Sequence, residues 1–101
     1  MRFGLTDSQY LLLEELIINP LKLKNALVYI FGSRARGEHQ KFSDIDVLFI
    51  DDPKNTIDHR YISRLKESVE ESNFPLKVDL VRDSELAKSF RESVDRDKVL
   101  V

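Results

Sequence analysis

The sequence predicts an α/β fold of the α+β type, in which one sheet is flanked by helices. Two patterns that alternate along the 101 residues support this fold class. Short apolar runs rich in β-branched and aromatic residues are typical of buried strands; they span 26–31, 44–50 and 76–81. Longer segments with apolar residues three or four apart are typical of helices; they span 7–18, 57–72 and 85–94. A chain of this length predicts a single domain, residues 1–101.

Composition excludes several classes of protein. The formal net charge of −2 argues against a protein held on nucleic acid by bulk electrostatics. The absence of cysteine excludes disulfides, zinc thiolates and cysteine nucleophiles. The first ten residues lack a signal-peptide pattern, and no apolar run approaches membrane-spanning length. We therefore expect a cytoplasmic protein that is bound neither to a membrane nor to nucleic acid.

The first helix is expected to begin and end at recognisable signals. Thr6 and Gln9 have the spacing of a capping box, with Thr6 as the N-cap. Leucine and isoleucine residues follow at helical spacing and are expected in the core. Asn19-Pro20 is expected to end the helix, because the residue before proline is pushed out of the α region.

The first two strands are expected to be antiparallel neighbours. Gly32 interrupts the apolar run 26–31, and Gly32–Gly37 is expected to form a turn that continues into a short helix. The second run, Asp44–Ile50, follows after about a dozen residues, which is short for the crossover that parallel strands need.

The second half of the chain predicts two helices and a strand. Asn55 or Thr56 can cap the helix 57–72, and Asp83 or Ser84 can cap the helix 85–94. The strand 76–81 lies between them. The apolar tail 99–101 could add an edge strand or contact a partner.

Two aspartates one residue apart are the first candidate site. Asp44 and Asp46 share one face of their strand, roughly 6.5 Å apart along it, so that both could reach one or two cations. Asp79 stands among apolar neighbours and needs a partner or a metal; beside the second strand it would supply a third carboxylate. The structural alternative is that Asp44 caps a turn and Asp79 pairs with Lys77 or an arginine.

The glycine-bracketed turn is the second candidate site. Gly32 permits close approach of a ligand, and the hydroxyl and amide of Ser33 can donate to phosphate oxygens. Arg34 and Arg36 could neutralise phosphate charge. The turn is not a P-loop, since the Gly-Lys-Ser/Thr ending is absent. The structural alternative is a surface turn with solvated arginines.

The two histidines are not expected to bind metal. Neither His39 nor His59 stands at metal-ligand spacing from another histidine. We expect His39 to be a solvated loop residue, although it could touch a nucleotide, and His59 to lie on a helix surface.

Together, Gly32–Gly37 and Ser43–Val47 resemble the signature of the polymerase-β-like nucleotidyltransferases, and more closely that of the minimal nucleotidyltransferases of prokaryotes. The resemblance covers nearly the whole chain. It implies a mixed sheet flanked by helices. It also implies roles for individual residues: phosphate binding by Gly32 and Ser33, metal binding by Asp44 and Asp46, and a third carboxylate at Asp79. Arg36 matches the arginine of the family's Ala-Arg-Gly, whereas Arg34 falls at a variable position.

The resemblance implies an enzyme that transfers AMP, or another NMP, from an NTP such as ATP to a hydroxyl group. Two Mg²⁺ ions are the implied cofactors, and Asp79 would help to deprotonate the acceptor. Such domains are often encoded with a small helical partner of the HEPN type, and the pair can act as toxin and antitoxin. Homo- and hetero-oligomers are both open.

Two alternative functions remain. One is an antitoxin or regulatory subunit that neutralises its partner by binding alone. The other is an antibiotic-type adenylyltransferase that modifies a small molecule, which usually carries a second domain for its acceptor. We expect a protein acceptor, because no segment is left over for an acceptor pocket. The expected contact surfaces are the tail 99–101 and the leucine-rich first helix.

Overall fold

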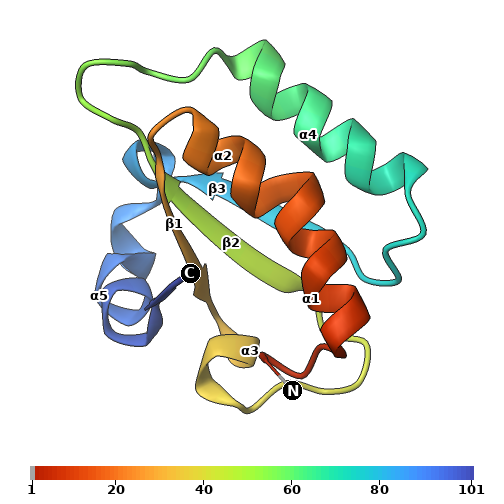
Figure 1. Cartoon of the computed structure of the whole chain (residues 1–101). Helices are drawn as coiled ribbons and strands as arrows, with labels where there is room; N and C mark the ends of the chain where they lie inside the picture. Colours follow the sequence, from red (N-terminus) through yellow and green to blue (C-terminus); the bar gives the residue numbers. More distant parts are fainter. Residues whose placement is uncertain (1) are drawn as a thin grey trace.

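A four-stranded mixed sheet forms the centre of the computed structural model, which describes residues 2–101 (Figure 1). Its strands, in the order β3-β2-β1-β4, are Val78–Arg82, Ile45–Ile50, Leu27–Phe31 and Val99–Leu100. β1 pairs antiparallel with β2 and β4, whereas β2 pairs parallel with β3. The antiparallel pair β1–β2 and the mixed sheet are therefore confirmed, and the apolar tail does add an edge strand.

The helices lie on both faces of the sheet (Figure 1). They are α1 (Asp7–Leu13), α2 (Asn19–Leu23), α3 (Ser33–Arg36), α4 (His59–Glu71) and α5 (Lys88–Asp97). A π-helical turn, η1 (Glu14–Ile18), joins α1 to α2, and a 3-10 turn, η2 (Asp83–Glu85), precedes α5. Within residues 2–101, no helix has both the length and the apolar content that crossing a membrane requires.

One face of the sheet carries the core. Val28, Ile30 and Val47 point to this face and are buried. Against them pack the leucine and isoleucine residues of the first helix, together with the apolar stripe of α4. Tyr61 of that stripe is only partly buried, and its hydroxyl donates a hydrogen bond of 3.0 Å to the Pro20 carbonyl. The opposite face of the sheet is covered in part by α5 (Figure 1).

The first helix does not end at Asn19-Pro20, so that prediction is wrong. Proline lacks an N–H and cannot make the usual helical bond to the residue four before it. The π-helical turn immediately before Pro20 changes the hydrogen-bond pattern, and the Asn19 N–H donates to the Glu14 carbonyl. Pro20 then occupies the first turn of α2, where a missing N–H costs little. The capping box at Thr6 is present as predicted.

Three smaller predictions also need correction. The N-cap of α4 is Asp58, whose carboxylate accepts a bond of 2.8 Å from the Arg60 N–H, and not Asn55 or Thr56. Strand β3 begins at Val78, two residues later than expected. Residues Asp83–Glu85 form a separate 3-10 turn, so α5 begins at Lys88 without a side-chain cap.

Candidate active site

The turn after β1 has a conformation that requires glycine. Gly32 has φ 78° and ψ −159°, and α3 begins directly after it at Ser33. A Cβ atom on Gly32 would lie 2.2 Å from the Oδ2 atom of Asp46. Both the backbone angle and this close approach exclude a side chain here. The glycine thus brings the turn into contact with Asp46, one of the predicted metal ligands.

The predicted carboxylates lie on the sheet face opposite the core. Asp46 and Asp79 are register partners in the parallel β2–β3 pair, and Phe31 of β1 is the antiparallel partner of Asp46. Register partners point to the same face of a sheet, so these two aspartates are neighbours on one face. Asp44 precedes Asp46 by two residues, which places it on the same side.

Electrostatics at this end of the sheet favour a bound cation. Burial, followed by the negative charges of Asp79 and Asp44, raises the pKa of Asp46 to about 6, and Arg36 opposes the shift. Within residues 2–101, no three histidine, cysteine, aspartate or glutamate side chains converge closely enough to hold a metal ion. The donor chemistry nevertheless fits Mg²⁺, which takes a few carboxylates and completes its ligands with water and substrate phosphate.

Arg36 is held by two carboxylates. Its NH1 group donates to Asp97 Oδ2 at 3.0 Å, and its Nε group donates to Glu38 Oε2 at 3.2 Å. Asp97 is only 9% exposed, whereas Glu38 is 70% exposed. Hydrogen bonds from Arg96 and Arg36 hold the pKa of Asp97 below its usual range. No local pattern of residues predicts this pair, because the partners are 61 residues apart.

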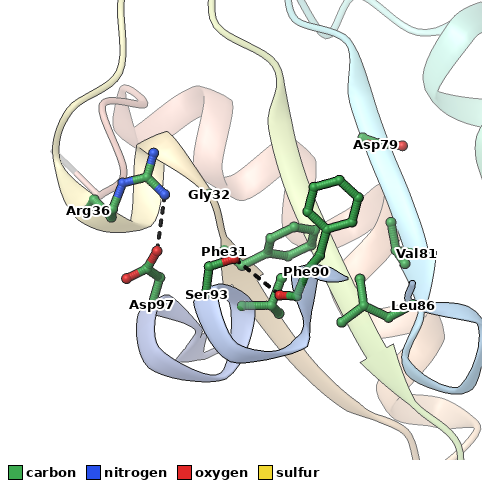
Figure 2. Close-up of a pocket in the computed structure, with 10 residues that line it drawn as sticks. Phe31, Gly32, Arg36, Asp79, Val81, Leu86, Phe90, Ser93 and Asp97 are labelled. Atoms are coloured by element: carbon green, nitrogen blue, oxygen red, sulfur yellow. Dashed lines mark hydrogen bonds and ion pairs between the residues drawn. The ribbon is translucent and has the colours of Figure 1, made fainter. Parts of the chain in front are cut away.

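A pocket of about 370 Å³ opens between the sheet and α5 (Figure 2). Its apolar wall consists of Phe31, Val81, Leu86, Phe90 and Val94, and its polar rim consists of Gly32, Arg36, Asp79, Ser93 and Asp97. Figure 2 shows Arg36 and Asp97 facing each other at one end, with Phe90 projecting over the apolar wall. α5 therefore walls a pocket beside Asp79, a role that the sequence did not predict for this helix. Phe90 of α5 is 60% exposed at this pocket.

A family model decides the classification of this site. The model described as polymerase beta, nucleotidyltransferase matches residues 15–101. The chain belongs to this nucleotidyltransferase family. The match includes the Gly32 turn, all three aspartates and α5.

Individual relatives agree with this classification. The Haemophilus influenzae protein named "Probable protein adenylyltransferase MntA" is 35% identical over 74 residues, which are 73% of this chain and 63% of that protein. The chain therefore spans less than two thirds of this curated relative. A solved structure described as a candidate minimal nucleotidyltransferase is 31% identical with a TM-score of 0.63, over 92% of this chain and 95% of that one. A crystal structure of a toxin-antitoxin with AMP-PNP is 26% identical with a TM-score of 0.65, over 86% and 70%.

Arg34 has a different place in this nucleotidyltransferase site from the one expected. Its guanidinium group is turned into the protein, and the residue is 3% exposed. It donates to the backbone carbonyls of Ser43, Phe3 and Lys41 at 3.0, 2.9 and 3.3 Å. These bonds occupy Nε, NH1 and NH2, so the guanidinium group of Arg34 is not exposed to bind a phosphate.

The histidines lie apart from the carboxylates. His39 is not the solvated residue that we expected, because its ring packs against Gly4 and its Nδ1 atom is buried with no hydrogen-bond partner among residues 2–101. His59 is exposed at the start of α4, as expected.

Proposed function

We propose that this domain is a magnesium-dependent nucleotidyltransferase that moves AMP, or another NMP, from an NTP to a hydroxyl group of a protein partner. The partner would be a small helical toxin of the HEPN type, and the domain would act as its antitoxin. The observation that supports this proposal best is that Asp46 and Asp79 are register partners on neighbouring strands, beside the Gly32 turn. This pairing supports a site in which phosphate and carboxylates meet.

The proposed roles follow the order of the residues across the sheet. Ser33, at the start of α3, and Arg36 would bind the β- and γ-phosphates. Asp44 and Asp46 would face the α-phosphate, and Asp79, on the next strand, would face the acceptor. This order would place the leaving group and the acceptor on opposite sides of the reacting phosphorus, as an in-line displacement requires.

The proposed reaction forms one bond and breaks one. The acceptor oxygen bonds to the α-phosphorus, the bond from that phosphorus to its bridging oxygen breaks, and pyrophosphate leaves. Asp79 accepts the acceptor's proton and releases it to solvent. Mg²⁺, when held by Asp44, Asp46 and Asp79, would stabilise the negative charge that develops on the oxygens.

The relatives support a protein acceptor in an antitoxin pair. The Haemophilus influenzae relative is named a protein adenylyltransferase, and the AMP-PNP structure is that of a toxin-antitoxin. We assign a protein acceptor and an antitoxin role to this domain because it shares the motif and the family with these relatives.

Incubation with labelled ATP, Mg²⁺ and a HEPN-type partner tests the proposal. Mass spectrometry of the partner should show added AMP. Asp46→Asn should abolish the addition, because loss of a shared metal ligand forfeits several kcal/mol of transition-state stabilisation. Glu67→Gln, at an exposed position of α4 outside the expected contact surfaces, is the control and should leave the addition unchanged.

A second measurement separates modification from binding. Asp46→Asn should still bind the partner in a pull-down experiment but fail to neutralise its toxicity in cells. If this variant neutralises an unmodified partner as well as the wild type does, the domain acts by covering the toxin, and the proposed enzymatic role is wrong.

A further inference from the structure

Arg34 ties three separate segments together. It stands in α3, and its guanidinium reaches the carbonyls of Lys41 and Ser43 in the loop before β2 and the carbonyl of Phe3 near the N-terminus. Among residues 2–101, its side chain forms no ion pair with a carboxylate. A nearly buried charge that is satisfied only by backbone carbonyls is costly, so this arrangement needs a compensating role.

A second contact joins the N-terminal segment to the loop before β2. The ring of His39 lies against Gly4, and a Cβ atom on Gly4 would lie 2.0 Å from its Nε2 atom. Gly4 also has a positive φ of 74°. The residues around it form a tight turn, in which the Leu5 N–H donates to the Arg2 carbonyl at 2.8 Å. Leu5 is fully buried in the core and anchors this turn.

The loop from 38 to 43 depends on these contacts. The Glu38 N–H donates to the Ser33 carbonyl at 2.9 Å and fixes the start of the loop, whereas the bonds from the N–H groups of Gln40 and Ser43 stay within it. Phe42 is exposed and does not anchor the loop to the core. Figure 1 shows the N-terminal segment running beside α3 and this loop, which leads directly into Asp44 and β2. The turn at residues 2–5 lies before residue 15, where the match to the family model begins.

We propose that residues 2–5, which we call the N-terminal clasp, act with Arg34 and His39 to fix the loop 38–43 and thereby to position Asp44 and Asp46. Arg34 is then a positioning residue of the site and not a ligand of the nucleotide. The inference rests on the proposed function for its consequence in catalysis. A misplacement of about 1 Å in a catalytic group can cost roughly 10²-fold in rate, so a loop released from its anchors would disable the site.

Amide hydrogen exchange and nucleotide binding test the clasp together. Arg34→Lys keeps the charge but cannot span three carbonyls, and Gly4→Ala drives a methyl group into the His39 ring. Each change should speed exchange in residues 38–43 by at least about tenfold and weaken AMP-PNP binding with Mg²⁺ by at least about tenfold. Exchange in β1 and α4 should stay near the wild-type rate.

Two controls separate positioning from general destabilisation. Ile62→Ala removes a core contact in α4 beside Phe49, at the opposite end of β2 from the loop, and should lower global stability without selectively exposing residues 38–43. The double variant Gly4→Ala with His39→Ala lacks the ring that the new methyl group would strike. It should therefore bind AMP-PNP more tightly than Gly4→Ala alone.

The outcomes also distinguish the clasp from the proposed function. If the wild type binds no nucleotide, the proposed function fails, but selective exposure of the loop in both variants still supports the clasp. If loop exchange is unchanged in Arg34→Lys and Gly4→Ala, the clasp is wrong. It is also wrong if their loss of nucleotide affinity is no larger than that of Ile62→Ala.

Discussion

The carboxylate of Asp46 occupies the space in which a side chain at Gly32 would begin. A Cβ atom on Gly32 would meet Oδ2 of Asp46 at 2.2 Å, and its Cγ at 3.2 Å. The turn and the carboxylate strand are therefore interlocked at one point, where β1 ends and β2 begins. Neither motif can move relative to the other without changing this contact.

Gly32→Ala should disable the site more than it destabilises the fold. The added methyl group must displace the Asp46 carboxylate, and the positive φ adds strain of about 1 kcal/mol. We expect AMP transfer to fall at least about 100-fold. Gly37→Ala is the matched control, because Gly37 also has a positive φ, of 75°, but no atom within 4 Å of an added Cβ. Urea unfolding should show a larger loss of stability in Gly32→Ala, since only this variant displaces a neighbouring side chain and its backbone angles are essentially confined to glycine. Equal loss of activity in the two variants would contradict this interpretation.

Asp46 should destabilise the metal-free domain at neutral pH. Its pKa is raised from 3.8 to about 6, so between about pH 4 and 6 the folded chain binds more protons than the unfolded chain. Stability therefore falls as the pH rises through this window. At pH 7.5 the full penalty is present, and Asp46→Asn should remove it.

The expected gain from Asp46→Asn at pH 7.5 is about 1 kcal/mol, since solvent screens this half-buried group. Urea unfolding in EDTA should show the gain at pH 7.5 and its near disappearance at about pH 4. A variant that is less stable than the wild type at pH 7.5 would mean that the carboxylate is stabilised by contacts that outweigh its burial.

Local signals in the sequence predicted the elements of this fold well. The apolar runs correctly predicted strands β1 and β2, and the capping box correctly predicted the start of the first helix at Thr6. Pro20 misled the prediction because a proline within the first turn of a new helical segment costs little. The π-helical turn that makes this possible has no distinct pattern of residue types.

Long-range contacts at the site were not predictable in the same way. The motif pointed to Asp44, Asp46 and Asp79, since their spacing and alternation are local properties. Pairing of Arg36 with Asp97 depends on how α5 returns over the sheet, which no local pattern encodes. Arg34 illustrates the limit most clearly, because an arginine in a turn looks the same in sequence whether it faces phosphate or backbone carbonyls.

Asp97 should prepare Arg36 for phosphate binding. Asp97→Asn weakens the bond that orients the Arg36 guanidinium, and we expect KM for ATP to rise several-fold with a smaller change in kcat. Glu38→Gln alters the other partner of Arg36, but Glu38 is 70% exposed and its change should leave KM within about twofold. Steady-state kinetics of AMP transfer measure both. A lower KM in Asp97→Asn would show instead that Asp97 competes with the nucleotide for Arg36.

A second buried network holds the end of the sheet away from the site. Arg82 in β3 forms an ion pair with Asp51, and it also donates to the Ile57 carbonyl at 2.9 Å. The Ile57 N–H in turn donates to the Asp51 carboxylate at 3.1 Å. Glu85 also contacts Arg82, but its side chain is 70% exposed. This network fastens the segment between β2 and α4 to the end of β3.

Asp51→Ala should be among the most destabilising polar substitutions in the chain. It leaves the Arg82 guanidinium, which is only 12% exposed, without its buried counter-ion, and it removes the acceptor of the Ile57 N–H. Removal of one partner from a buried ion pair costs about 3–5 kcal/mol, and the exposed Glu85 should reduce that to about 2–3 kcal/mol. Urea unfolding measures the loss. Arg60→Ala is the matched control, because its ion pair is exposed and should contribute nothing measurable. Equal effects of the two substitutions would mean that Arg82 finds water or another acceptor, and the network would then not hold this end of the sheet.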